Sequence, residues 1–217
     1  MLGAANAPDT LLRVYGGSDK RKHGYLGYYR RHLGRYRLAR NVVFEIGVGR
    51  YASRSVGGSL ALWRDYLPRS VIVGIDIYDK DVRIGRTVKF AQADQNDPAQ
   101  LQAVVDLHGR PDIVIDDGSH VGEHINTSFE HLWPQLRPGG MYVIEDLATS
   151  YAPHFGGGHP PPAESGVGLA QSLVSDVQAS DHGFAMYPQF SAPPSPKFAD
   201  LAAVHAYPGI AFIEKAR

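Results

Sequence analysis

Carboxylates and one imidazole gather at two short stretches of the chain, IDDGSH (115–120) and VIEDL (143–147). Each stretch follows an apolar run that reads as a buried strand. So many carboxylates at one point repel each other unless a cation lies between them, and oxygen ligands suit a hard ion such as Mg²⁺. A neutral imidazole beside that ion can take the proton of a substrate hydroxyl. The residues that could do this chemistry are Asp116, Asp117, His120, Glu145 and Asp146.

The alternative without a functional site is that one acid of each pair caps a helix and that His120 belongs to an ordinary surface loop. Whether these side chains lie close together depends on the strands and helices that carry them. Apolar, β-branched runs alternate with segments of helical spacing, which predicts parallel strands covered on both faces by helices. The predicted strands are 42–48, 71–77, 88–94, 112–117 and 141–147, and the clearest helices are 58–67, 97–107 and 123–136.

Two further strands, 200–207 and 210–215, are separated only by Pro208 and Gly209, which predicts an antiparallel hairpin at the sheet edge. The fold class is therefore α/β: a Rossmann-like, doubly wound, mostly parallel sheet ending in an antiparallel hairpin, the arrangement of class I methyltransferases. The carboxyl ends of the strands, where the acids collect, are the ligand-binding edge of such sheets.

Composition limits the partners. The 217 residues, 43% of them hydrophobic, predict a single globular domain. Lys plus Arg equals Asp plus Glu at 22 each, so no global charge points to nucleic acid or membrane. The absence of cysteine excludes disulfides and thiolate sites. With no signal-peptide pattern and no membrane-length apolar run, we expect a soluble cytoplasmic protein, and the residues leave a homo-oligomer open.

Glycines after the first predicted strand indicate a cofactor turn. Gly47 and Gly49 satisfy the G-x-G-x-x-A variant of the dinucleotide fingerprint, but helical spacing begins too late to cradle a pyrophosphate. Glu45, just before them, would repel a pyrophosphate and suits the ammonium of a methionine-like group. This favours S-adenosylmethionine over a nicotinamide cofactor. At the same edge lie Asp76 for the ribose hydroxyls, Asp94 and Gln95 for the adenine edge, and Asp116.

Two flanking segments have open roles. Between Arg13 and Arg40 there are nine Lys or Arg, one acid and five tyrosines, which fits either a solvated helix face or a basic, aromatic rim for a polar substrate. We interpret residues 1–40 as a helical segment that caps the substrate and cofactor. The Gly/Pro-rich segment 150–168 predicts a mobile lid or plain disorder, and a helix is expected over 167–179.

Several motifs together are similar to the metal-dependent sugar O-methyltransferases, which include macrolide enzymes acting on mycinamicin and macrocin sugars. They are EIGVG, GGSLALW, GIDIYDK, DIVIDDGSH, LRPGGMYVIEDL and FIEK. The resemblance implies that Asp117 and Asp146 bind the metal, that Glu145 or Glu45 supplies a third carboxylate, and that His120 is the base. The acceptor groove would be lined by His23, Tyr25, Tyr28 and Tyr29.

The expected function is thus Mg²⁺-dependent methyl transfer from S-adenosylmethionine to the hydroxyl of a sugar or short oligosaccharide. About 40 residues precede the first predicted strand, whereas the macrolide enzymes have a large additional N-terminal domain. In this compactness the sequence is more similar to the mycobacterial enzyme that makes methylmannose polysaccharide. That resemblance implies methylation of the 1-OH of a 3-O-methylmannoside. The alternatives are a polyketide or macrolide sugar, a catechol-like molecule, an NAD(P)-dependent oxidoreductase and a non-catalytic binding module. The paired DDGSH and IEDL motifs argue against the last, because binding alone needs no base.

Overall fold

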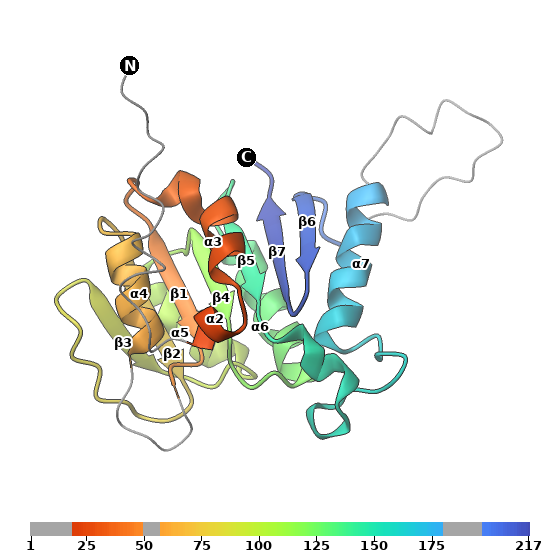
Figure 1. Ribbon diagram of the computed structural model, residues 1–217. Coiled ribbons are helices and arrows are strands. Elements are labelled where there is room, and N and C mark those ends of the chain that lie inside the picture. Colours follow the sequence, from red (N-terminus) through yellow and green to blue (C-terminus); the bar gives the residue numbers. More distant parts are fainter. Residues whose placement is uncertain (1–18, 50–56, 180–196) are drawn as a thin grey trace.

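A seven-stranded sheet forms the centre of the computed structural model, which describes residues 19–49, 57–179 and 197–217 (Figure 1). The strand order is β3-β2-β1-β4-β5-β7-β6. The first five strands run parallel, β7 is antiparallel to β5, and β6 is antiparallel to β7. This confirms the predicted fold class. The strands are β1 (Val42–Ile46), β2 (Val71–Asp76), β3 (Val88–Gln92), β4 (Ile113–Asp116), β5 (Met141–Ile144), β6 (Leu201–Tyr207) and β7 (Ile210–Lys215).

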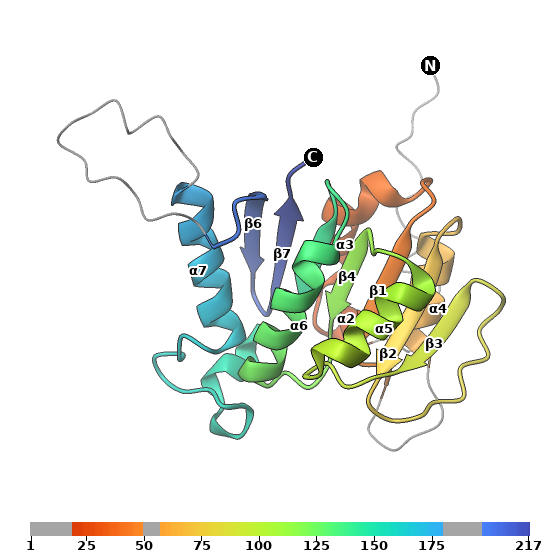
Figure 2. The same cartoon turned by 180° about the vertical axis from the view of Figure 1, so that it is seen from behind.

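Helices cover both faces of the sheet (Figures 1 and 2). Their apolar sides fall into two buried clusters, one on each face, which explains why the parallel strands read as continuous apolar runs. One face carries α5 (Pro98–His108), α6 (Gly122–Gln135) and α7 (Gly166–Ala179), and the other carries α3 (Leu26–Leu33) and α4 (Gly58–Tyr66). The short α2 (Asp19–Lys22) precedes α3, and η1 (Gly34–Tyr36) follows it.

The five parallel strands end one to three residues earlier than predicted. The largest difference is in the strand predicted over 141–147. There β5 stops at Ile144, so Glu145 and Asp146 stand beyond the last ladder position. On the helical side, Asp97 caps α5 by accepting the N–H groups of Ala99 and Gln100. Glu145 and Asp146 therefore belong to the start of the loop after β5.

The Gly/Pro-rich segment 150–168 is folded back on itself. It includes part of η2 (Leu147–Tyr151), then η3 (Pro153–Phe155) and the start of α7. The N–H groups of Gly157 and Gly158 donate to the carbonyls of Ala152 and Ser150, each at 3.0 Å. Its role as a lid stays a prediction. Residues 1–18 of the predicted capping segment lie outside the described residues. Among the described helices, none is long and apolar enough to cross a bilayer.

Candidate active site

The acids meet at the carboxyl edge of the sheet because the parallel strands are in register. Ile46, Asp116 and Ile144 are aligned across β1, β4 and β5. The residue after β4, Asp117, donates its N–H to the Ile46 carbonyl at 3.0 Å, and Glu145 donates to the Asp116 carbonyl at 2.9 Å. The carboxylates therefore follow two neighbouring strands at one level, as the sequence predicts.

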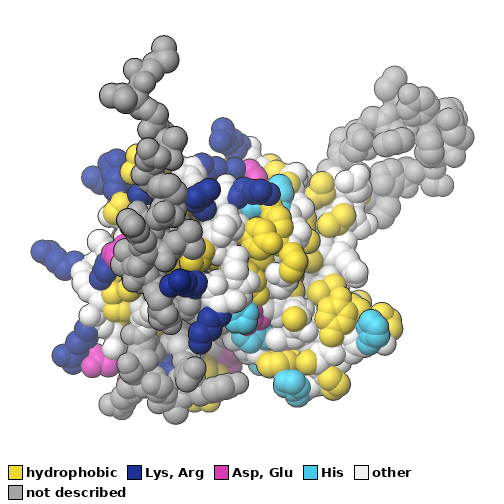
Figure 3. All heavy atoms as spheres, viewed as in Figure 1, with side chains coloured by type: hydrophobic (Ala, Val, Ile, Leu, Met, Phe, Trp, Pro, Cys, Tyr) yellow, Lys and Arg dark blue, Asp and Glu magenta, His cyan; other side chains and the backbone are white. Residues whose placement is uncertain are grey.

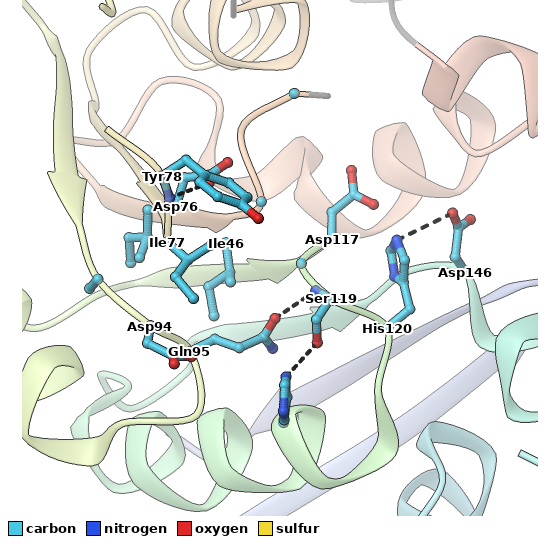
Figure 4. Close-up of a pocket in the computed structure, with 16 residues that line it drawn as sticks. Ile46, Asp76, Ile77, Tyr78, Asp94, Gln95, Asp117, Ser119, His120 and Asp146 are labelled. Atoms are coloured by element: carbon cyan, nitrogen blue, oxygen red, sulfur yellow. Dashed lines mark hydrogen bonds and ion pairs between the residues drawn. The ribbon is translucent and has the colours of Figure 1, made fainter. Parts of the chain in front are cut away.

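Three side chains form a candidate cation site. Ligand atoms of Asp117, His120 and Asp146 all lie within 4.8 Å of one another. His120 Nε2 is 3.9 Å from Asp146 Oδ2, and the side chains of Asp117, His120 and Asp146 are 19%, 21% and 29% exposed. Figure 4 shows the three pointing toward one space from two different loops. The site is therefore partly enclosed but open to a ligand.

The loops hold two of these residues in a rare backbone conformation. His120 (φ 60°) and Asp146 (φ 52°) are the two non-glycine residues with positive φ in the described parts of the chain. Such residues cost free energy and persist where surrounding contacts fix them, often at functional sites. Here the Asp146 carbonyl accepts both the N–H and the Oγ1 hydroxyl of Thr149, at 2.9 Å and 2.8 Å. The strain thus coincides with the candidate cation site.

A buried lysine lies behind the cation site. Lys20 is fully buried, and its Nζ is 2.6 Å from Glu145 Oε1, 2.8 Å from Asp117 Oδ2 and 3.3 Å from Glu45 Oε1. Tyr29 is also fully buried and donates its hydroxyl to Glu145. Glu45 and Glu145 therefore face this inner ammonium, whereas Asp117 belongs to both groups.

Electrostatics explain this pairing. Burial lowers the pKa of Lys20, but the three carboxylates outweigh it, so the pKa lies well above its ordinary value and the ammonium stays charged. Burial and the nearby Asp117 charge, against the Lys20 charge, raise the pKa of Glu145 to about 8. Burial likewise raises the pKa of Glu45. The raised pKa values of Glu145 and Glu45 reduce the negative charge around Lys20, so the candidate cation site rests on the carboxylates of Asp117 and Asp146.

Tyr25 connects the N-terminal segment to Asp146. It is 3% exposed, and its hydroxyl lies 2.9 Å from Asp146 Oδ1 and 3.0 Å from the Gly209 carbonyl. Two of the predicted acceptor residues, Tyr25 and Tyr29, are thus buried and directed at carboxylates. Of the other two, His23 is exposed with Nδ1 3.8 Å from Asp146 Oδ1, and Tyr28 stacks on Tyr207 at 4.1 Å between ring centroids.

A cavity of about 550 Å³ extends from the cation site along the strand ends. Both glycines of the predicted cofactor turn line it, with positive φ. Gly47 packs so closely that a Cβ there would lie 2.0 Å from the Asp117 carbonyl oxygen, so only glycine fits. Asp76 accepts the N–H of Val48 at 3.0 Å and of Tyr78 at 2.9 Å, which fixes its carboxylate at the rim. Asp94 and Gln95 line the same cavity.

Two predicted cofactor residues do not line this cavity. Glu45 faces Lys20, as described above. Asp116 is 2% exposed and accepts the Ser128 hydroxyl at 2.6 Å and the Gln95 amide at 3.2 Å. Gln95 in turn accepts the N–H of Ser119 at 2.7 Å, which ties the end of β3 to the loop that carries His120 (Figure 4). Asp116 thus acts on the cavity through Gln95.

Sequence reasoning missed several residues of the site. Lys20 lies in the basic segment without any local sign that it is buried, because its partners are 25 to 125 residues away. Tyr78 and Ser119 line the cavity as well. His124, which the sequence offers with His131 as the weaker alternative to His120 as base, also lines it, with Nδ1 2.9 Å from Ser119 Oγ. Ser119 belongs to the DDGSH motif that drew attention to His120, so proximity in sequence was a usable signal.

The donor set suits a hard divalent cation. Two carboxylates from neighbouring strand ends offer oxygen ligands, and partial exposure leaves room for the waters that Mg²⁺ keeps. The structure brings Asp117 and Asp146 together with His120, while Glu145 and Glu45 remain on the Lys20 side. A third carboxylate ligand from either of them stays a prediction.

Comparison with known proteins identifies relatives. No protein-family model matches the chain. It is 39% identical over 99% of its length to 8-demethyl-8-alpha-L-rhamnosyl tetracenomycin-C 2'-O-methyltransferase of Streptomyces olivaceus, of which it covers 57%. It is 42% identical to demethylmacrocin O-methyltransferase of Streptomyces fradiae and 41% identical to mycinamicin VI 2''-O-methyltransferase of Micromonospora griseorubida, over 89% and 90% of the chain and 49% of each relative. The chain spans about half the length of the curated relatives it matches.

Solved structures give the same picture. The MycE methyltransferase of mycinamycin biosynthesis, in complex with Mg and SAH, superposes with a TM-score of 0.78 at 39% identity, covering 88% of this chain and 48% of that one. MycE with Mg, SAH and mycinamycin VI gives 0.79 at 36% identity, covering 91% and 52%. The fold is therefore a Rossmann-like methyltransferase fold.

Proposed function

In sequence and fold the chain is a relative of the macrocin and mycinamicin sugar O-methyltransferases, and on this premise we propose that it transfers a methyl group from S-adenosylmethionine to a sugar hydroxyl. One observation carries the proposal. The cation site of Asp117, His120 and Asp146 opens directly into the 550 Å³ cavity whose other end is lined by Asp76 and Asp94. A methyl donor in that cavity and a hydroxyl at the cation site would be neighbours.

The chain's own residues divide the work. Asp76 keeps lone pairs beyond the two backbone N–H groups it accepts, so it can bind ribose hydroxyls. Asp117 and Asp146 would hold Mg²⁺, which lowers the pKa of an acceptor hydroxyl when bound. His120 then takes the hydroxyl proton as the oxygen forms its bond to the methyl carbon and the carbon–sulfur bond breaks. Fixed alignment of oxygen and methyl is a large part of such rate enhancements.

The acceptor is best proposed as a sugar on a polyketide or macrolide glycoside. The names of the relatives specify rhamnosyl tetracenomycin C, demethylmacrocin and mycinamicin VI as their substrates. The expectation of a 3-O-methylmannoside finds no support among them. A polyketide or macrolide sugar, the alternative acceptor expected from the sequence, is therefore favoured over the mannoside.

Methyl transfer to rhamnosyl tetracenomycin C and to demethylmacrocin tests the proposal, with a simple catechol as comparison. We expect S-adenosylhomocysteine to form with a glycoside and Mg²⁺, and no turnover in EDTA or in Asp117→Asn. His120→Ala should lose at least about a hundredfold in kcat while S-adenosylhomocysteine binding, measured by calorimetry, is unchanged. Full activity in EDTA would reject the metal, and methylation of the catechol alone would reject the sugar acceptor.

A further inference from the structure

An apolar groove lies beside the candidate active site. Its volume is about 470 Å³, and it runs between η2, the first half of α7 and the β6–β7 turn. None of the described residues that line it is charged, and Gln171 supplies its one side-chain amide. The residues that matter most to its chemistry are Leu147, Tyr151, Val167, Val174, Val204 and Tyr207.

The groove presents apolar surface to solvent. On α7, Val167, Ala170 and Val174 lie on one stripe that lines the groove, while Leu169 and Leu173 of the same helix are buried in the core. Val174 is 45% exposed and Tyr151 is 48% exposed, although both are large and hydrophobic. Figure 3 shows hydrophobic side chains gathered on the side that carries α7 and the hairpin, with histidines close by. Contiguous exposed apolar surface of this kind marks a binding surface.

The inner end of the groove is built from the chain that holds Asp146. Leu147, which lines the groove, follows Asp146 directly and donates its N–H to the Gly209 carbonyl at 2.9 Å. The same carbonyl faces the hydroxyl of Tyr25, which also reaches Asp146. The groove thus begins one residue from the cation site, on the side away from Asp76 and Asp94.

We propose that this groove binds the hydrophobic aglycone of a glycoside acceptor, an inference that rests on the proposed function. A sugar whose hydroxyl reaches His120 and Asp146 can place the rest of the acceptor beyond Asp146, on the side opposite Asp76 and Asp94. A volume of 470 Å³ is within the range of small-molecule sites. A mannoside chain would instead bury most of its hydroxyls against the apolar side chains of the groove, where Gln171, Tyr151 and Tyr207 offer few partners, and unpaired burial is costly.

Two acceptors with the same sugar test this directly: methyl α-L-rhamnoside and rhamnosyl tetracenomycin C. The wild type should show a lower KM for the polycyclic glycoside.

Val174→Glu puts a charge in the groove at a half-exposed position, where the fold tolerates it. It should raise the KM of rhamnosyl tetracenomycin C at least about tenfold and leave both the KM of methyl rhamnoside and S-adenosylhomocysteine binding unchanged. Leu107→Glu, 75% exposed on α5, is the matched control and should change neither KM.

Equal KM values for the two acceptors, or a Val174→Glu variant that binds the large glycoside like the wild type, would overturn the groove and leave methyl transfer intact. If neither glycoside is methylated, the proposed function fails. Calorimetry with the aglycone tetracenomycin C, on the wild type and Val174→Glu, then still decides the groove. A dimer that Val174→Glu dissociates without any change in KM would show that a second copy covers the groove, and would also reject the inference.

Discussion

Asp146, a candidate metal ligand, is held in place by several surrounding contacts. Its backbone is in the left-handed region (φ 52°), which is unfavourable for a residue with a side chain. Thr149 fixes its carbonyl, and the Tyr25 hydroxyl fixes its carboxylate from the N-terminal segment. Outer partners of this kind orient metal ligands and set how tightly the ion binds. We therefore propose Tyr25 as a positioning residue for Asp146, and its predicted contact with a sugar acceptor stays a prediction.

Tyr25→Phe removes this hydroxyl without changing the shape of the side chain. We expect divalent-ion affinity to fall about tenfold or more, because the Asp146 carboxylate loses its fixed orientation. Calorimetric titration with Mg²⁺, or electron paramagnetic resonance with Mn²⁺, measures this without any turnover. Tyr28→Phe is the control, since Tyr28 stacks on Tyr207 and has no contact with Asp146 among the described interactions. Equal ion affinities in the two variants would contradict the assignment.

At the scale of elements, the α2–α3 segment supplies donors to the strand-end acids. Lys20 binds Asp117 and Glu145, Tyr25 binds Asp146, and Tyr29 binds Glu145. These donors come from the segment that the sequence left open between a solvated face and an acceptor rim, and here they form a buried inner wall. The β6–β7 turn completes that wall, because Gly209 brings its carbonyl to the Tyr25 hydroxyl.

Gly209→Ala tests the turn. Gly209 has φ 78°, and a Cβ there would lie 2.5 Å from the Tyr25 hydroxyl oxygen. Gly156 has nearly the same φ, 77°, with no atom within 4 Å of the added Cβ. Gly156→Ala therefore measures the free-energy cost of a positive φ without any steric contact. We expect Gly156→Ala to lower the free energy of unfolding by about 1 kcal/mol. Gly209→Ala should lower it by about 1 kcal/mol more, because the Tyr25 hydrogen bonds must also break.

Urea unfolding of both variants gives the two free energies, and a Mg²⁺ titration of each shows whether the ion site follows. Only Gly209→Ala should weaken ion binding, through Tyr25. If the two variants lose the same stability and both keep the ion affinity of the wild type, the contact between Gly209 and Tyr25 contributes nothing to the site.

In the whole molecule, three regions lie in a row along the carboxyl edge of the sheet. The 550 Å³ cavity reaches from the ends of β1, β2 and β3 to the cation site after β4 and β5, and the apolar groove lies beside the hairpin and α7. This order follows from the strand order, because β1 and β4 are neighbours although two strands separate them in sequence. The chain spans about half of its relatives' length and still brings these three regions together.

Ligand-induced stabilisation tests whether the 550 Å³ cavity binds the methyl donor. S-adenosylhomocysteine at a hundred times its Kd should stabilise the folded state by about 2.7 kcal/mol, because it binds that state only. For a domain of this size the melting temperature should then rise by about 5–10 °C. NADH at the same concentration is the control and should leave the melting temperature unchanged. A larger shift with NADH would support the nicotinamide alternative.

The strands, the hairpin and the acids at the strand ends could all be predicted from the sequence. These are local properties: continuous apolar runs mark strands covered on both faces, and parallel order brings Asp117 and Asp146 to one edge. The place of His120 beside them followed from its spacing of three residues from Asp117.

Which side chains face one another across that edge depended on the folded chain. Lys20 and Glu145 are 125 residues apart, and Tyr25 and Gly209 are 184 apart. In a segment rich in tyrosine and charge, local patterns do not distinguish a buried donor from a solvated one, because burial depends on what packs above it. The separation of Asp116 and Glu45 from the cavity, the inner place of Tyr25 and Tyr29, and the apolar groove all arise from contacts between segments that are distant in sequence.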